Sequence, residues 1–206
     1  MRGKNISAED LTAKKELALE VIRRLKAEYP DAGCTLDYDH AWQLLVSVRL
    51  AAQCTDARVN IVVQDLFAKY PSVAALAEAE PEDIEAIVKP CGLGRSKARD
   101  ISACMRMLRD KYDCKVPTTF EELLALPGVG RKSANLIMGD VFGKPAIVTD
   151  THCIRLCNKI GLAIMPMGTV MNGTPRWLLC IGMRRMVSSQ LSSVSVRGRS
   201  DRKSVV

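Results

Sequence analysis

The sequence lacks several features that would assign it to a class at once. No apolar run approaches the roughly 20 residues that a membrane-spanning helix needs, and residues 1–19 are polar and charged, without the apolar core of a secretion signal. Eight cysteines are present, but no two are spaced Cys-x-x-Cys, and most fall within apolar helical patterns, where a free thiol behaves as a small buried hydrophobic group. We therefore expect a cytoplasmic protein with no membrane partner and no disulfides.

The positive charge is unevenly distributed along the chain. The formal net charge is +7, which ordinarily suggests an anionic partner. Residues 1–162 hold 23 Lys and Arg against 22 Asp and Glu, whereas residues 163–206 hold 7 Lys and Arg against 1 Asp. Nearly all of the excess lies in the last segment, so the total charge says little about what the folded part binds.

Helical periodicity extends from the first residues to about Ile160, and the one β-like run, residues 145–149, is short. A weak capping signal, Ser7 with Asp10, precedes the first helical pattern, and Ser96 should cap the longest of the later helices. This pattern predicts an all-α protein. The later helices should cover 40–53, 55 or 56 to 70, a short stretch after Ser72, a segment from Pro81, 96–112, 120–126, 131–142 and 151–160.

An internal repeat relates residues 87–98 to residues 123–134 at an offset of 36. Each copy has an apolar helix end, then Gly-apolar-Gly-Arg, then a new helix. Both copies can be ordinary helix hairpins with glycine C-caps. The two copies differ in the chemical groups that each turn presents.

The strongest local signal is Leu126-Pro-Gly-Val-Gly-Arg-Lys-Ser-Ala134. Gly128 and Gly130 permit a tight turn and let another backbone approach closely. The free N–H groups of the turn and of the next helix form a site for an anion such as a phosphate. Lys132 lies in the first turn of that helix, where the helix dipole and partial burial favour a neutral, nucleophilic amine. The alternative is an ordinary solvated lysine.

Two further motifs accompany this segment. Val148-Thr-Asp-Thr-His-Cys-Ile-Arg155 places Asp150 at a helix start, 18 residues after Lys132. As an N-cap, Asp150 would need no functional role. The run Leu50-Ala-Ala-Gln-Cys-Thr-Asp-Ala-Arg-Val-Asn60 forms a polar turn between two helices, and there Asp56 can also be explained as an N-cap.

Together, these motifs resemble the endonuclease III family of DNA repair glycosylases over about residues 16–162. The resemblance implies that Lys132 and Asp150 are catalytic, that Gln53 and Leu93 fill the space left by a flipped nucleotide, and that Asp56 and His152 lie at the lesion pocket. The remaining DNA contacts would be Gly128, Val129, Gly130 and Arg131. Leu93 can alternatively be explained as a helix C-cap contact, and Gly94 departs from the bulky aromatic that the family commonly has there.

The resemblance also implies a two-lobed helix-hairpin-helix glycosylase fold with the DNA cleft between the lobes. Residues 34–144 would form a helical barrel domain, and residues 1–33 with 145–162 would form an incomplete second lobe. The family's four C-terminal cysteines, Cys-x6-Cys-x2-Cys-x5-Cys, ligate a [4Fe–4S] cluster, but only Cys180 follows Cys157 here. We therefore expect no cofactor, an aberrant and disordered tail over 163–206, and loss of the native reading frame soon after Leu162.

The function that the resemblance implies is base excision repair. The family removes oxidised pyrimidines from damaged double-stranded DNA and cleaves the abasic site through a lysine Schiff base and β-elimination. The adenine-excising branch has serine where Lys132 stands, so Lys132 favours the bifunctional glycosylase/lyase. We expect a monomer associated with the nucleoid. The alternatives are a non-catalytic helix-hairpin-helix DNA-binding protein and an inactive truncated product.

Overall fold

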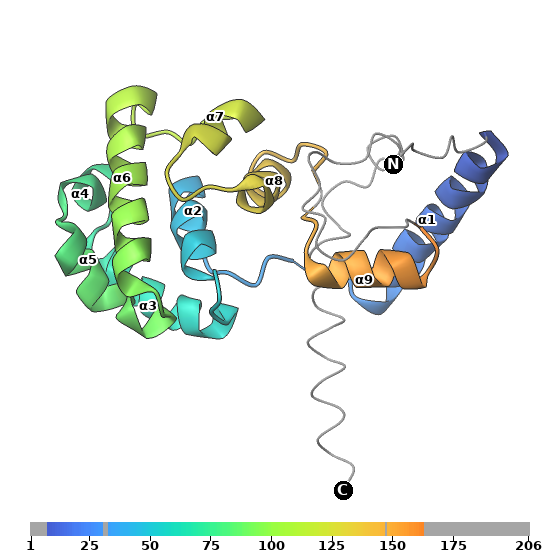
Figure 1. Ribbon diagram of the computed structural model, residues 1–206, viewed down its shortest axis with the longest axis horizontal. Helices are drawn as coiled ribbons and strands as arrows, with labels where there is room; N and C mark the ends of the chain where they lie inside the picture. Colours follow the sequence, from blue (N-terminus) through green and yellow to red (C-terminus); the bar gives the residue numbers. More distant parts are fainter. Residues whose placement is uncertain (1–7, 31–32, 147, 163–206) are drawn as a thin grey trace, which may run out of the picture. The chain divides into compact units, whose positions relative to one another are not determined.

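The computed structural model describes residues 8–30, 33–146 and 148–162, and it is helical throughout that part of the chain (Figure 1). No strand occurs among these residues, which confirms the all-α prediction. None of the described helices is long and apolar enough to cross a membrane. The elements are α1 (Ala8–Glu28), α2 (Ala41–Leu50), α3 (Asp56–Lys69), α4 (Val73–Glu78), α5 (Pro81–Val88), the 3₁₀ helix η1 (Lys89–Cys91), α6 (Gly94–Tyr112), α7 (Phe120–Ala125), α8 (Arg131–Asp140) and α9 (Thr151–Lys159).

The chain divides into two compact units. Unit 2 is Cys34–Phe142 and holds α2 to α8, and unit 1 combines the described residues of 1–33 and 143–206, with α1 and α9. The lobe boundaries expected from the sequence stay a prediction. The expected tail, 163–206, and the Ser7 cap lie outside the described residues.

The core of unit 2 is built around α6. This helix packs against α4 and α5, while α2 packs against α3, α6 and α8 (Figure 1). Burying each large aliphatic side chain contributes about 1.5–3 kcal/mol relative to leaving it in water. The fully buried aliphatic residues of this core include Leu44, Leu50, Leu66, Leu76, Ile84, Leu108, Leu123 and Ile137.

Hydroxyl N-caps set three helix starts in unit 2. Thr55, Ser72 and Thr119 each accept a hydrogen bond from the backbone N–H three residues later. This satisfies a donor that the helix itself leaves without a partner. Ser72 precedes the short helix expected after it, and Thr55 and Thr119 precede the helices expected from 55 or 56 and from 120.

The expected cap at Ser96 is wrong. Helix α6 begins at Gly94, two residues earlier, because Gly92 (φ 72°) and Leu93 (φ 52°) turn the chain through left-handed conformations directly into the helix. The Ser96 hydroxyl instead accepts a hydrogen bond from Arg49 Nη2 at 3.4 Å.

In unit 1, α9 begins after Asp150, whose Oδ1 accepts a hydrogen bond from the backbone N–H of Cys153 at 2.7 Å. Cys153 and Cys157 are both buried on one face of this helix, with their Sγ atoms 4.0 Å apart. Asp150 is therefore the N-cap that the sequence allows, which fixes the position of its carboxylate relative to α9.

Candidate functional site

The turn between α7 and α8 is held by close packing at Gly128. This residue has φ +75°, and a Cβ built on it would lie 2.9 Å from the Asp100 Cβ and 3.1 Å from the Arg49 Cδ. Any larger residue would have to displace those two side chains and also adopt a strained backbone conformation. Glycine is therefore required by both the conformation and the space.

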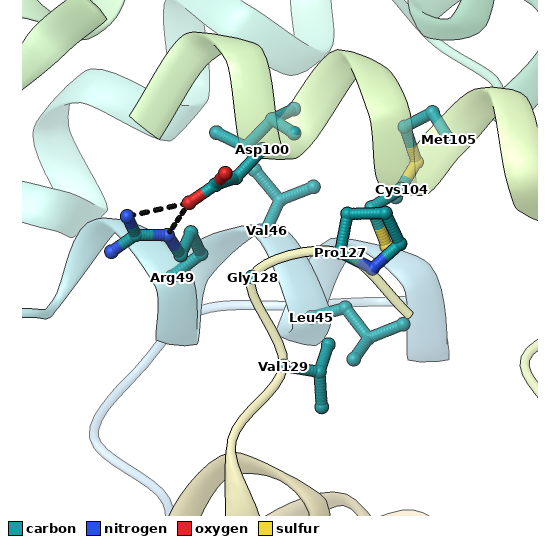
Figure 2. Close-up of a pocket in the computed structure, with 10 residues that line it drawn as sticks. Leu45, Val46, Arg49, Asp100, Cys104, Met105, Pro127, Gly128 and Val129 are labelled. Atoms are coloured by element: carbon teal, nitrogen blue, oxygen red, sulfur yellow. Dashed lines mark hydrogen bonds and ion pairs between the residues drawn. The ribbon is translucent and has the colours of Figure 1, made fainter. Parts of the chain in front are cut away.

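The side chains that press on Gly128 form an ion pair between α2 and α6 (Figure 2). Arg49 Nε and Nη2 both donate to Asp100 Oδ2, at 2.7 and 2.6 Å, and the two side chains are 21% and 33% exposed. The crevice beside the pair, lined also by Pro127 and Val129, has a volume of about 10 Å³, room for at most one water. The Arg49–Asp100 pair therefore packs against the turn from the side of α2 and α6 and does not line a ligand pocket.

Nothing in the sequence points to Arg49 and Asp100 as partners, because no spacing rule joins positions 51 residues apart on two helices. Their effect is to fix the turn that carries Gly128 and Val129 against the body of unit 2.

The start of α8 is open. Gly130 is its N-cap, with φ −97°, no side chain to cap the helix, and no described atom within 4 Å of a Cβ built on it. The first intrahelical bond runs from Ala134 N to Gly130 O, so the N–H groups of Arg131, Lys132 and the next residue precede the helical ladder. Such a helix start is suited to an anion.

Lys132 lies in this first turn and its side chain is exposed, as is that of Arg131. The expected partial burial of Lys132 is therefore wrong. Exposure leaves the amine accessible to a large substrate.

Two other turns of unit 2 project exposed side chains from strained backbone. Gln53 has φ 59° and Leu93 has φ 52°, although neither is glycine. Left-handed backbone in a non-glycine residue costs about 1–2 kcal/mol and is concentrated at functional sites. Leu93 is 57% exposed, so it does not make the packed contact that would explain it structurally.

A buried lysine lies beneath both turns. Lys97 in α6 is 0% exposed, and its Nζ donates to Leu50 O and to Cys91 O, each at 2.8 Å. Lys97 was not among the residues predicted for the site, although the sequence carries a signal for its burial. Lys97 is spaced four residues from Ile101 and seven from Cys104, on the buried stripe of α6.

Asp56 lies at the first position of α3, with Thr55 as the N-cap. The alternative that Asp56 itself is the cap is therefore wrong. The Thr35 hydroxyl donates to Asp56 Oδ2, and Asn60 Nδ2 donates to the Thr35 carbonyl at 2.8 Å. These bonds hold the Asp56 carboxylate against the segment that enters unit 2.

The residues expected at the site are distributed over both units. Gln53, Asp56, Leu93 and the 128–132 turn belong to unit 2, and Asp150 and His152 to unit 1. His152 lies in the first turn of α9, and its side chain is outside what the structure describes. Within unit 2, Lys97 links the Gln53 and Leu93 turns through the backbone.

Comparison with known proteins matches residues 46–166 to the HhH-GPD superfamily of base excision DNA repair proteins. Endonuclease III of Synechocystis sp. is 45% identical over 153 residues, covering 74% of this chain and 70% of that protein. The solved structure of a non-covalent endonuclease III–DNA complex has a TM-score of 0.71 and 37% identity, covering 84% of each chain. A trapped endonuclease III–DNA covalent intermediate has a TM-score of 0.70 and 34% identity, covering 87% of this chain and 81% of that one.

These findings overturn the expectation that no cofactor is bound. The relatives belong to a family that carries a [4Fe–4S] cluster, and this chain has eight cysteines. The expectation rested only on the spacing of cysteines after Cys157. Among the described residues, no three His, Cys, Asp or Glu side chains gather as a metal site. The described cysteines therefore do not by themselves supply four thiolates, and Cys180 lies outside the described residues.

Proposed function

The chain belongs to the HhH-GPD superfamily of base excision DNA repair proteins, and from this we propose that it excises oxidised pyrimidines from damaged duplex DNA and cleaves the resulting abasic site. It is a homologue of endonuclease III, whose family consists of bifunctional glycosylase/lyases. The observation that carries the proposal is the position of Lys132. It is an exposed amine in the first turn of a helix whose start is open to a phosphate.

Binding begins at the DNA backbone. The N–H groups of Arg131 and Lys132, which precede the helical ladder of α8, hold a phosphate near the lesion, as an open helix start favours. The sugar C1′ is shielded inside a duplex, so the damaged nucleotide is flipped out before reaction. Gln53 and Leu93 fill the vacated stack and offset part of the cost of unstacking. Their exposed side chains and outward turns support this role.

Chemistry follows at the flipped nucleotide. The neutral amine of Lys132 attacks C1′, and the bond from C1′ to the base breaks. Positive charge develops on the sugar as this bond breaks, and the Asp150 carboxylate stabilises it. The sugar ring opens to a Schiff base, which acidifies the C2′ proton. Loss of that proton expels the 3′ phosphate by β-elimination and nicks the strand. Asp56 and His152 contribute to the lesion pocket.

A covalent trap tests the proposal. A duplex containing thymine glycol is incubated with the protein and borohydride, which reduces a Schiff base to a stable adduct. We expect an adduct with the unmodified chain and none with Lys132→Gln. Lys115→Gln is the matched control, because Lys115 is an exposed lysine of the same unit, paired with Asp113 at 2.9 Å.

Four outcomes contradict the proposal. An active preparation that forms no adduct, or a Lys132→Gln variant that still forms one, shows that Lys132 is not the nucleophile. Duplex binding without cleavage indicates a non-catalytic DNA-binding protein. A chain that neither binds nor cleaves is an inactive product.

A further inference from the structure

The Lys97 side chain joins the Gln53 and Leu93 turns through a hydrogen bond to the backbone at each. Its two acceptors, Leu50 O and Cys91 O, are the last carbonyls of α2 and η1. The chain reaches Gln53 three residues after the first acceptor and Leu93 two residues after the second. One buried ammonium group therefore fixes the start of both turns.

This arrangement costs free energy that packing alone would avoid. A buried ammonium group is expensive to desolvate, and an apolar side chain of similar volume would often be no worse for stability. Burial lowers the pKa of Lys97. Burial is the main reason that the pKa of Cys91 is raised to about 11, and the neighbouring Cys54 thiol raises it further. The Cys54 and Cys91 thiols, one at each turn, therefore lie close to each other.

The two turns are strained, so the pair of hydrogen bonds from Lys97, here called the clamp, is needed to hold them in place. Gln53 and Leu93 are both held in left-handed conformations that an untethered chain would leave. Without the bonds from Lys97, each turn could relax independently. Their side chains would then no longer keep a fixed separation.

We propose that Lys97 is a positioning residue that holds the Gln53 and Leu93 turns in register, so that both side chains enter the duplex together when a nucleotide is flipped. The proposal rests on the function proposed above. Lys97 is fully buried and touches no DNA itself. It acts on the step that opens the duplex and not on the chemistry at Lys132, and this distinction can be measured.

The clamp itself is tested without DNA. Amide hydrogen exchange is compared between the unmodified chain, Lys97→Met and the control Lys111→Met, an exposed lysine of the same helix. We expect faster exchange at 51–54 and 91–94 in Lys97→Met, with α3 to α5 unchanged, and no change in the control. Equal exchange in all three proteins contradicts the clamp, whether or not the protein is an enzyme.

The functional effect is tested by comparing two substrates. Single-turnover rates are measured on a thymine glycol duplex and on single-stranded DNA with an abasic site, where no base must be unstacked. Because a misplacement of about 1 Å can cost about 100-fold in rate, we expect Lys97→Met to lower the duplex rate by at least about tenfold relative to the single-strand rate. A loss of the same size on both substrates contradicts the proposal.

A double-mutant cycle separates positioning from general structural damage. Lys97→Met is combined with Gln53→Ala and Leu93→Ala. If Lys97 acts only through those two side chains, its effect on the duplex rate disappears in the variant that lacks them. If the fold-change is undiminished there, Lys97 is merely structural and the inference is wrong.

Folding of the variant is checked by circular dichroism. If Lys97→Met does not fold, Lys97→Gln, which keeps a polar amide group but not the charge, takes its place in all three comparisons. If neither variant folds even in the cold, Lys97 supports the whole unit and the inference is wrong. If the unmodified chain is inactive on both substrates, the proposed function fails, while the exchange experiment still decides whether the clamp exists.

Discussion

Replacing Gly128 with alanine should destabilise unit 2 by about 2–5 kcal/mol. The left-handed backbone at this position (φ +75°) costs an alanine about 1–2 kcal/mol. The added Cβ would lie 2.9 Å from the Asp100 Cβ and 3.1 Å from the Arg49 Cδ. Forcing a methyl group into a packed site typically costs about 1–3 kcal/mol. The ion pair behind the turn cannot move away without loosening the contact between α2 and α6.

Gly130→Ala is the matched control, two residues away in the same turn. Its φ of −97° suits any residue, and no described atom lies within 4 Å of the added methyl. Alanine is a poorer N-cap than glycine, but it reduces the entropy of the unfolded chain. The two effects should leave stability within about 0.5 kcal/mol of the original.

Urea unfolding followed by circular dichroism measures both variants, and a fluorescence titration measures their affinity for duplex DNA. We expect Gly128→Ala to lose stability, and Gly130→Ala to keep stability but bind DNA more weakly, because its methyl group stands at the open helix start. Equal stability for the two variants would refute the packing argument, and unchanged affinity in Gly130→Ala would refute the phosphate site at α8.

Three other predictions follow from local geometry. Arg49→Met and Asp100→Asn should each cost about 1 kcal/mol, discounted for partial exposure, and a double-mutant cycle in urea should show coupling, whereas additive losses would count against the ion pair. Asp150→Asn should keep the N-cap and its melting temperature but lose most excision activity, while Asp150→Ala should also lose about 1 kcal/mol of stability. Burial raises the pKa of Cys104 to about 12, so the stability that its neutral thiol contributes is present below about pH 9 and is lost as pH rises towards 12. Iodoacetamide at pH 8 should label the exposed Cys114 before the buried Cys104, as mass spectrometry can check.

Local signals allowed most of the helices to be predicted from the sequence. Thr55, Ser72 and Thr119 are good caps before apolar patterns, and each begins a helix. The start of α6 was misplaced because a leucine in the left-handed region replaces the side-chain cap that pattern rules expect. Propensity rules assign that conformation to glycine, so nothing local at Leu93 indicated it.

Contacts between residues far apart in the chain could not be predicted from the sequence. Arg49 and Asp100 meet only because α2 and α6 pack together. Lys97 was missed because lysines are usually solvated, although its place on the apolar stripe of α6 marked it as unusual. The roles of Lys132 and Asp150 came from family resemblance and stay predictions. The expectation that no cofactor is bound was wrong, because it relied on the spacing of cysteines in one segment and not on the family to which the chain belongs.

The most direct test of the central claim is to locate the covalent bond to DNA. After borohydride trapping on a thymine glycol duplex, the adduct is digested with nuclease and protease, and the peptides are sequenced by mass spectrometry. We expect the reduced sugar remnant to be attached to the Nζ of Lys132, with every other lysine peptide unmodified. A remnant on another lysine, or on the N-terminal amine, would contradict it.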